Sequence, residues 1–343
     1  MAVINRYFLA ANGFTGFRCY FKKLLDNKEL NKLYIIKGGS GVGKSTLMRR
    51  VSAEISTTGY DVEEILCSSD PTSLDGVLIH GGCGLVLLID GTSPHEYDMK
   101  YPIARDTIVD LSKHIDEGLI TQKRKEILEL IEKKQNHYRF AYKYLHIAGE
   151  IYKVISEITK KYLKKDDIKA LVNELLKNTE SIDGKEKNFL YSAFSRDGIT
   201  RLSVPGGGGN AYYFNSSVRT EILFSALIPE IKKHFSDITV YTSPLSEEIP
   251  EGFLLNGEIL FTTRKEASTY NSECYFEKET PTDKETLDGL TKLYEKLLDM
   301  AQDELSSAFL NHSTLEKIYG ECMNFEKNDS VYESLIEKIK SEI

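Results

Sequence analysis

Residues 38–46 read GGSGVGKST and follow an apolar stretch at residues 33–36. The segment contains the spacing G-x-x-x-x-G-K-[ST], in which glycines let the backbone curl so that successive N–H groups surround phosphate oxygens. Apolar residues recur at every fourth position from Leu47 to Ile55. This periodicity predicts a helix whose positive dipole end faces the loop. A glycine-rich turn is the ordinary alternative, but the strand–loop–helix context favours binding of a nucleoside triphosphate.

Each position of this loop has a physical role. We expect Lys44 to reach the β- and γ-phosphates and the Ser45 hydroxyl to ligate Mg²⁺. The predicted cofactor is ATP with Mg²⁺, and the residues expected to bind it are Gly38, Gly39, Ser40, Gly41, Val42, Gly43, Lys44, Ser45 and Thr46.

A second apolar run, residues 85–89, ends in Asp90. Such a run is typical of a buried parallel strand, and ligands bind beyond the carboxyl ends of strands in open α/β sheets. We therefore expect Asp90 to hold Mg²⁺ through water, opposite Ser45. An Asp that simply caps a turn is the alternative for this residue.

Further polar residues follow the predicted strands. Asp70, before Pro71, could supply a catalytic carboxylate toward the acceptor or the metal, although it also fits an Asx turn. His95 and Glu96 follow Asp90 closely and fit either contact with the γ-phosphate or a surface turn. The candidates for an arginine finger, which the sequence does not rank, are Arg49, Arg50, Arg105 and Arg196.

Several subclasses of nucleotide-binding protein lack support. No N-K-x-D guanine-recognition motif and no L-S-G-G-Q signature occur, and Lys37 is wrongly spaced for the ParA/MinD group. Gly91 follows Asp90 where many ATPases carry a glutamate that activates water. We therefore expect slow hydrolysis, a base from elsewhere in the chain, or transfer to an acceptor other than water.

The composition is that of a globular protein, with 41% hydrophobic and 28% charged residues in 343. No apolar stretch of 18 residues predicts a membrane span, and no secretory signal is evident. Five scattered cysteines without metal-ligand spacing favour a reducing, cytoplasmic environment. The net charge of -8 argues weakly against nucleic acid as a partner. A homo-oligomer stays open.

Two parts of the chain resemble one another. Residues 7–17 and 189–199 share an aromatic-rich opening that leads to Ala and a turn Gly, and residues 59–65 and 75–79 are echoed 176 positions later. The same offset places Thr220 on Lys44 and Glu221 on Ser45, and the glycines are missing. Residues 206–209 are a glycine run without a following G-K-[ST], and we interpret them as a flexible loop. The sequence thus predicts a second copy that has lost its nucleotide site.

Helical segments extend both copies. Apolar residues recur every three or four positions from about 120 to 163, a shorter helix returns through 171–176, and further helices are expected at 283–309 and 331–343. Residues 118–187 carry an excess of basic residues and 277–343 an excess of acidic ones. These regions are either solvated faces or attract each other or a charged protein partner.

The fold class predicted from these patterns is α/β, a phosphate-loop nucleotide-binding core with a mostly parallel sheet, duplicated, with a degenerate second copy and helical-hairpin insertions. Domain one is expected at 1–183 with its insertion at about 115–180, and domain two, the degenerate copy with C-terminal helices, at 184–343.

Four motifs together carry a family resemblance. They are Y-F-x-x-x-N-G-F-x-G from Tyr7, K-G-G-x-G-x-G-K-S-T-L-M from Lys37, C-S-S-D-x-x-S-L-D-G-V from Cys67 and I-D-G-T-x-P-H from Ile89. The chain resembles a bacterial family of tandem P-loop ATP-binding proteins, strongly over residues 7–110 and loosely beyond. The resemblance implies ATP binding but supplies no substrate. The family's second copy commonly keeps its own loop, and this chain departs from that pattern.

The leading prediction is an Mg-ATP-binding P-loop ATPase whose slow hydrolysis acts as a conformational switch. One alternative is a kinase acting on a small molecule or nucleotide. Another is a non-catalytic, ATP-dependent scaffold that binds a protein partner through its helices.

Overall fold

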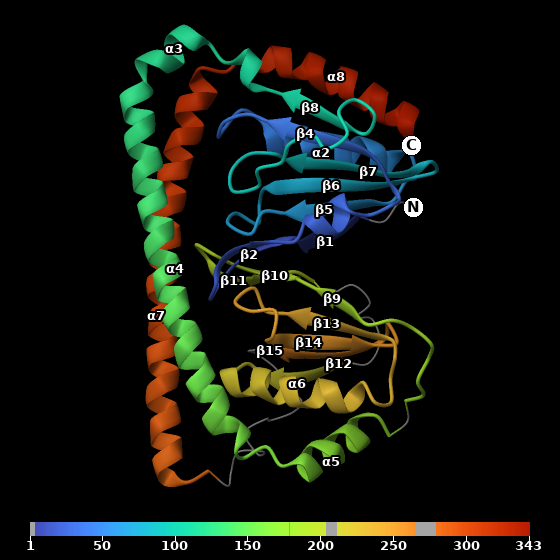
Figure 1. The fold of residues 1–343 in the computed structure, drawn as a ribbon, viewed down its shortest axis with the longest axis vertical. Coiled ribbons are helices and arrows are strands. Elements are labelled where there is room, and N and C mark those ends of the chain that lie inside the picture. Colours follow the sequence, from blue (N-terminus) through green and yellow to red (C-terminus); the bar gives the residue numbers. More distant parts are fainter. Residues whose placement is uncertain (1–3, 178, 204–210, 265–278) are drawn as a thin grey trace.

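A computed structural model of the chain describes residues 4–177, 179–203, 211–264 and 279–343. Two β-sheets lie one above the other along the long axis of the molecule, and two long helices run beside both of them (Figure 1). The protein is therefore α/β, as its sequence predicts.

The first sheet has six strands. In spatial order they are β1 (Ile4–Phe8), β5 (Val62–Leu66), β6 (Leu74–Gly81), β7 (Gly84–Asp90), β4 (Leu30–Lys37) and β8 (Asp106–Asp110). The centres of β4 and β7 are buried on both faces, which explains their continuous apolar sequence. Strand β6 is antiparallel to both of its neighbours because a tight hairpin joins it to β7. The sheet is mixed, and the prediction of a mostly parallel sheet is not confirmed.

The second sheet repeats this order with five strands. They are β9 (Lys187–Phe189), β13 (Ile238–Thr242), β14 (Pro250–Leu255), β15 (Ile259–Arg264) and β12 (Ala211–Asn215). Their pairings are parallel, antiparallel, antiparallel and parallel. The same succession runs from β1 to β4 in the first sheet. Strand β8 has no counterpart among the described residues.

Two β-hairpins lie where the sheets approach each other (Figure 1). The first is β2 (Ala10–Gly13) with β3 (Gly16–Cys19), and the second is β10 (Ser192–Ser195) with β11 (Gly198–Arg201). The buried Asn12 Nδ2 donates a hydrogen bond to Phe194 O at 2.9 Å. Phe8 N–H donates to Leu190 O at 3.0 Å. These bonds join the two halves directly.

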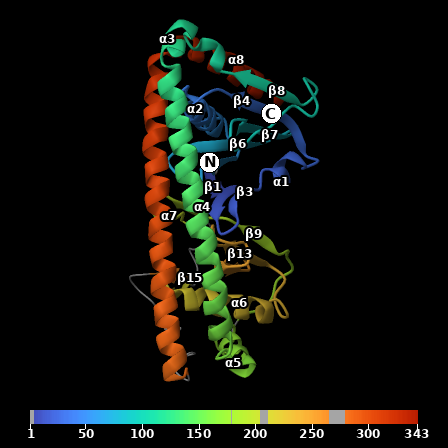
Figure 2. The same ribbon diagram turned by 60° about the vertical axis from the view of Figure 1, so that its left-hand side comes forward.

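The long helices are α4 (Arg124–Lys160) and α7 (Pro281–Glu321). Ile127 near the start of α4 packs with Leu315 near the end of α7, whereas Tyr162, just beyond α4, donates a hydrogen bond to Asp283 at the start of α7. The two helices are therefore antiparallel, and Figure 2 shows them side by side. The basic and acidic helical regions do associate with each other.

The remaining helices are shorter. They are α1 (Lys22–Leu25), α2 (Lys44–Thr57), the 3₁₀ helix η1 (Ser112–His114), α3 (Glu117–Gln122), α5 (Lys165–Leu175), α6 (Val218–Ile231) and α8 (Phe325–Glu342). Leu335 and Ile339 of α8 share a core with Tyr34 of the first sheet. The C-terminal helix thus lies on the first sheet, although the sequence places it with the second domain. None of the described helices combines the length and hydrophobicity needed to cross a bilayer.

Candidate phosphate site

A six-residue loop connects β4, which ends at Lys37, to α2, which begins at Lys44. Gly41 has φ 72° and Gly43 has φ 92°, a backbone region that favours glycine. Gly43 is the N-cap of α2 and provides no side-chain cap. The first N–H groups of the helix therefore face the loop without a competing cap, as an anion site requires.

The Lys44 side chain folds back over the loop. Its Nζ donates hydrogen bonds to Gly38 O at 2.9 Å and Gly39 O at 2.8 Å. It also lies 3.6 Å from Asp90 Oδ2, and both side chains are mostly buried. Lys44 and Asp90, which are 46 positions apart in the sequence and are predicted to share one site, therefore lie next to each other.

Asp90 ends β7, and in the parallel pairing of β7 with β4 it lies opposite Ile36. Its Oδ1 accepts hydrogen bonds from Thr92 N–H at 2.8 Å and Thr92 Oγ1 at 2.5 Å. Burial raises the pKa of Asp90, and the Lys44 charge and the Thr92 hydrogen bonds oppose this rise. The carboxylate is held in one orientation, with Oδ2 toward Lys44.

Ser45 and Asp90 are the residues that could hold a magnesium ion if phosphates and water completed its coordination. Ser45 Oγ accepts a hydrogen bond from Leu74 N–H at 2.9 Å, which leaves a lone pair for a cation. Among the described residues, no group of three or more His, Cys, Asp or Glu could hold a metal alone. Mg²⁺ prefers oxygen ligands and commonly takes only one or two from the protein, because water molecules and phosphate oxygens fill its other coordination positions.

Asp70 adopts the turn that its sequence also allows. Its Oδ1 accepts hydrogen bonds from Thr72 N–H at 3.2 Å and Thr72 Oγ1 at 2.7 Å, which is an Asx turn. Arg196 of the second half lies 3.9 Å from the same oxygen. A catalytic role for Asp70 stays a prediction, and its observed contacts are structural.

Two helices outside the core, α7 and α8, pack on the loop, and the sequence does not reveal this. A Cβ on Gly41 would lie 2.3 Å from Glu316 O, and one on Gly39 would lie 3.0 Å from the Tyr319 ring. Asn328 of α8 donates a hydrogen bond to Val42 O at 2.9 Å. Helix α7 therefore lies directly against the apex of the loop.

Charged groups from α4 and α7 surround the loop. Burial lowers the pKa of Lys134, and the Lys44 charge lowers it further. Burial, together with the charges of Lys134 and Lys44, lowers the pKa of His312 to about 4, so that its imidazole is neutral at pH 7. His312 Nδ1 lies 3.4 Å from Ser40 Oγ. Burial raises the pKa of Glu316.

The structure ranks the four arginine candidates. Arg50 pairs with Asp329 and lies over the Tyr332 ring, Arg105 binds Asp106, and Arg49 donates to a backbone carbonyl. Arg196 instead stacks on the Phe309 ring of α7 at 3.3 Å from Cζ to the ring centroid. It also lies 3.9 Å from Asp70, whose charge acts to raise the pKa of both His312 and Glu316.

His95 does not fit the predicted contact with a γ-phosphate. Its Nε2 lies 3.0 Å from Asp75 Oδ2 and its Nδ1 lies 3.5 Å from Cys19 Sγ, so both ring nitrogens have other partners. Glu96 is exposed in the surface turn.

The equivalent connection in the second sheet is much shorter. Strand β12 ends at Asn215 and α6 begins at Val218, which leaves two residues where the first half has six. Ser217 Oγ caps the helix by accepting a hydrogen bond from Thr220 N–H at 3.2 Å. Helix α6 therefore begins at Val218, so the offset of 176 does not place Thr220 at the first position of its helix, which Lys44 occupies in α2. The glycine run at 206–209 lies outside the described residues.

Glu221 lies in the first turn of α6. Burial raises its pKa to about 8, the Glu251 charge adds to the rise, and Arg201 opposes it. The folded chain holds this proton between about pH 4.5 and 8 while the unfolded chain has lost it, so stability falls as pH rises through that window.

Glu221→Gln is therefore expected to raise the free energy of unfolding at pH 8 by about 2 to 4 kcal/mol and to change it little near pH 4.5. Urea unfolding at both values measures this difference. Glu258→Gln, an exposed carboxylate in the same half, serves as the control. Equal effects of Glu221→Gln at both pH values would contradict the buried-acid description.

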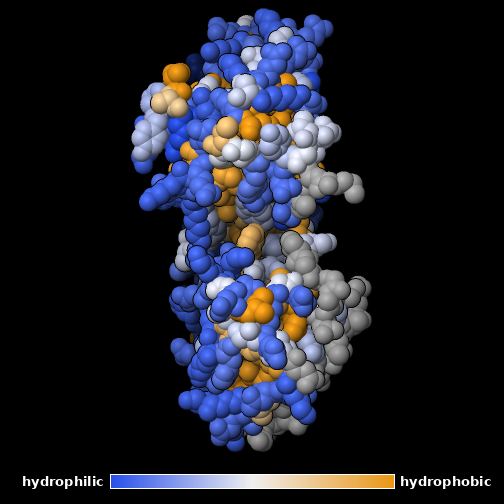
Figure 3. All heavy atoms as spheres, turned by 90° about the vertical axis from the view of Figure 1, so that its right-hand side faces the viewer, coloured by the Kyte–Doolittle hydropathy of each residue, from blue (hydrophilic) through white to orange (hydrophobic). Residues whose placement is uncertain are grey.

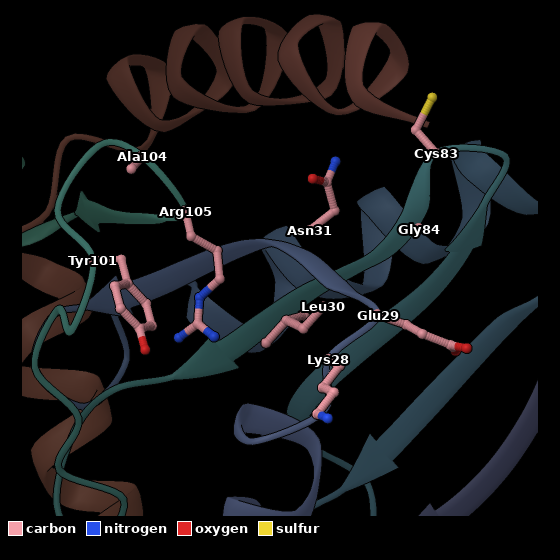
Figure 4. Close-up of a pocket in the computed structure, with 9 residues that line it drawn as sticks. All are labelled: Lys28, Glu29, Leu30, Asn31, Cys83, Gly84, Tyr101, Ala104 and Arg105. Carbon is pink, nitrogen blue, oxygen red and sulfur yellow. The ribbon is translucent and has the colours of Figure 1, made fainter.

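A shallow pocket of about 540 Å³ lies at the opposite end of the first sheet (Figure 4). Leu30 and Gly84, the first residues of β4 and β7, line it together with Arg105. Ligands in α/β sheets bind at the carboxyl ends of strands, so this pocket is not the nucleotide site. The face shown in Figure 3 is mainly hydrophilic, with hydrophobic residues in scattered groups.

No protein-family model matches the chain, and no significant match is found among curated proteins or solved structures. The functional argument therefore depends on the geometry of the site.

Proposed function

We propose that the chain binds Mg-ATP at residues 38–46 and hydrolyses it slowly, with the occupancy of the loop acting as a conformational switch. The observation that carries this proposal is the position of Lys44, whose Nζ lies over the glycine loop and 3.6 Å from the strand-ending Asp90. Bound Mg²⁺ would be held by Ser45 and Asp90 and would neutralise phosphate charge.

Two sequence features support the proposal that the nucleotide base is adenine and that hydrolysis is slow. The chain contains no N-K-x-D motif for guanine, and Gly91 stands after Asp90 in place of a glutamate base. Gly91 is also closely surrounded, since a Cβ there would lie 2.3 Å from Ile35 Cγ2. A water-activating side chain at this position has no room, which supports a slow reaction.

Helix α7 supports the switch. At one end its backbone contacts Gly41, and its neighbouring residues Phe309 and Ser306 contact Arg196 of the second half. Near its start, Asp288 lies 3.9 Å from Arg219 of α6. A displacement of the loop on phosphate binding would therefore reach the second sheet through one rigid helix.

We infer further that the second sheet is a degenerate copy of the first. The matching strand order and the matching 14-residue helices α2 and α6 support this. The two-residue connection before α6 has no room for a phosphate-binding loop. In this proposal the second copy is a mechanical partner of the first and carries no nucleotide.

Phosphate release tests the proposal. The full chain with Mg-ATP alone should release phosphate slowly, and added small-molecule acceptors should not change the rate. Release that requires an acceptor would identify a kinase, and ATP binding with no release under either condition would identify a scaffold. Either result contradicts the proposed ATPase.

Arg196→Ala provides a second arm of this experiment. Because an arginine that stabilises transferred charge contributes about 10³-fold or more to turnover, the variant should lose most of its phosphate release and keep its ATP affinity. Arg50→Ala, whose side chain contacts α8 instead, should retain the wild-type rate. An unchanged rate in Arg196→Ala would remove this arginine from the site.

One observation favours the scaffold as a second candidate. Phe140, Ile147 and Val154 recur every seven residues on α4, and they are 40%, 47% and 42% exposed. Such a stripe is typical of a helix that packs against a partner. A protein partner at this face is compatible with ATP binding at the loop.

A further inference from the structure

A cysteine, a histidine and an aspartate form a linear chain of contacts away from the phosphate loop. Cys19 Sγ lies 3.5 Å from His95 Nδ1, and His95 Nε2 lies 3.0 Å from Asp75 Oδ2. Cys19 ends β3, Asp75 lies on β6 and His95 follows β7. Residues from three separate elements thus meet in the order nucleophile, base and orienting carboxylate, which is the arrangement of an activated nucleophile.

The surroundings hold the imidazole in place. His95 is buried, and the rings of Phe17 and Phe21 meet it at an angle with centroid separations of 5.3 and 5.4 Å. Asp75 is also buried. The sulfur is different, because Cys19 is exposed at the surface and its Sγ has a further contact to Tyr97 OH at 3.1 Å. An external reagent can therefore reach the sulfur but not the histidine.

The charges favour a thiolate. Burial would lower the pKa of His95, but Asp75 and Cys19 outweigh it and raise the pKa to about 10, so the ring is an imidazolium at pH 7. Burial would raise the pKa of Cys19, but hydrogen bonds from His95 and Tyr97 lower it below its ordinary value. Other titratable groups that face this chain of contacts are Tyr20 beside Cys19, and Cys67, Asp90 and Tyr138, which interact with Asp75.

We propose that Cys19 is a nucleophilic thiolate that exchanges with small disulfides, that His95 is its proton partner and that Asp75 orients His95. The Cys19 sulfur attacks one sulfur of the disulfide and the S–S bond breaks. The departing thiolate takes its proton from solvent, because His95 is buried and out of its reach. The products are a mixed disulfide on Cys19 and one free thiol, and a second thiol reverses the reaction. The site does not overlap the residues that bind phosphate in the proposed function.

The test uses the full chain and 4,4′-dithiodipyridine, with peptide mass spectrometry to assign each modified cysteine. Cys83 is the internal control because it is exposed on the β6–β7 hairpin and lies outside the cluster. At pH 6 a cysteine of ordinary pKa is less than about 1% thiolate, so Cys19 should react at least about tenfold faster than Cys83. Equal rates for the two cysteines would overturn the proposal.

Two variants separate the chemistry from the fold. His95→Gln should reduce the Cys19 rate at pH 6 to that of Cys83 and leave the Cys83 rate unchanged. Tyr97→Phe, which removes one hydroxyl, should give a smaller reduction, and it keeps the proposal testable if His95→Gln does not fold. A wild-type Cys19 rate in both folded variants would refute the role of the cluster. Steady turnover of p-nitrophenyl acetate that depends on Cys19 would indicate an acyl hydrolase and overturn the assignment to disulfides.

Discussion

Lys44→Ala is expected to lower the affinity for Mg-ATP by about 100-fold or more while the chain stays folded. Lys44 is the only positively charged side chain in residues 38–46. Removing one partner of a desolvated charge pair, here the pair of lysine and phosphate, costs about 2 to 5 kcal/mol of binding free energy. Isothermal titration calorimetry at fixed Mg²⁺ measures the change. The neighbouring backbone N–H groups remain, so the binding that persists should be weak.

Lys44→Ala should also change the protonation of Asp90. The carboxylate keeps its hydrogen bonds from Thr92 but loses the cation 3.6 Å away, so its pKa should rise further and it should take up a proton more readily. Lys28→Ala, an exposed lysine at the opposite end of the sheet, removes the same charge and should leave ATP affinity unchanged. Wild-type affinity in Lys44→Ala would refute the site assignment.

Gly41→Ala is expected to destabilise the chain by roughly 3 kcal/mol or more and to weaken ATP binding. Two costs add at this residue. Its φ of 72° is unfavourable for alanine, and the new Cβ would lie 2.3 Å from Glu316 O. Because that oxygen belongs to the backbone of α7, the overlap cannot be relieved by a side-chain rotation. The loop and α7 must separate, and this displaces the N–H groups that we propose bind phosphate.

Gly59→Ala separates the two costs. Gly59 has φ 94°, and a Cβ there would meet nothing within 4 Å. This variant should therefore lose only about 1 to 2 kcal/mol of unfolding free energy, from the backbone alone. Urea unfolding measures the loss of unfolding free energy in both variants, and the difference between the two losses is the cost of the contact with α7. Equal losses in the two variants would mean that α7 does not press on the loop.

The phosphate loop, the strand-ending Asp90 and the long helices could all be predicted because their signals are local. A spacing of glycines, an apolar run and a three-to-four periodicity each depend on neighbouring residues. The contact of His312 with Ser40 joins residues 272 positions apart, and no local pattern marks either of them. The same holds for Lys134 and Glu316, which tertiary packing brings to the site.

The prediction of a mostly parallel sheet is not confirmed, because β6 pairs antiparallel with both β5 and β7. A short hairpin enforces its pairing with β7. The offset of 176 aligns β5 with β13, yet α6 begins 174 positions after α2. The connection before α6 is four residues shorter than the connection before α2, so the offset between the two halves changes at this point. Sequence comparison alone did not reveal the change.

The central claim is that the chain has one nucleotide site, at residues 38–46. A calorimetric titration of the wild-type chain with a non-hydrolysable ATP analogue and Mg²⁺ tests it most directly. We predict a stoichiometry of one per chain, with the affinity lowered about 100-fold or more by Lys44→Ala and unaffected by Thr220→Ala. A stoichiometry of two that falls to one in Thr220→Ala, or wild-type affinity in Lys44→Ala, would contradict it.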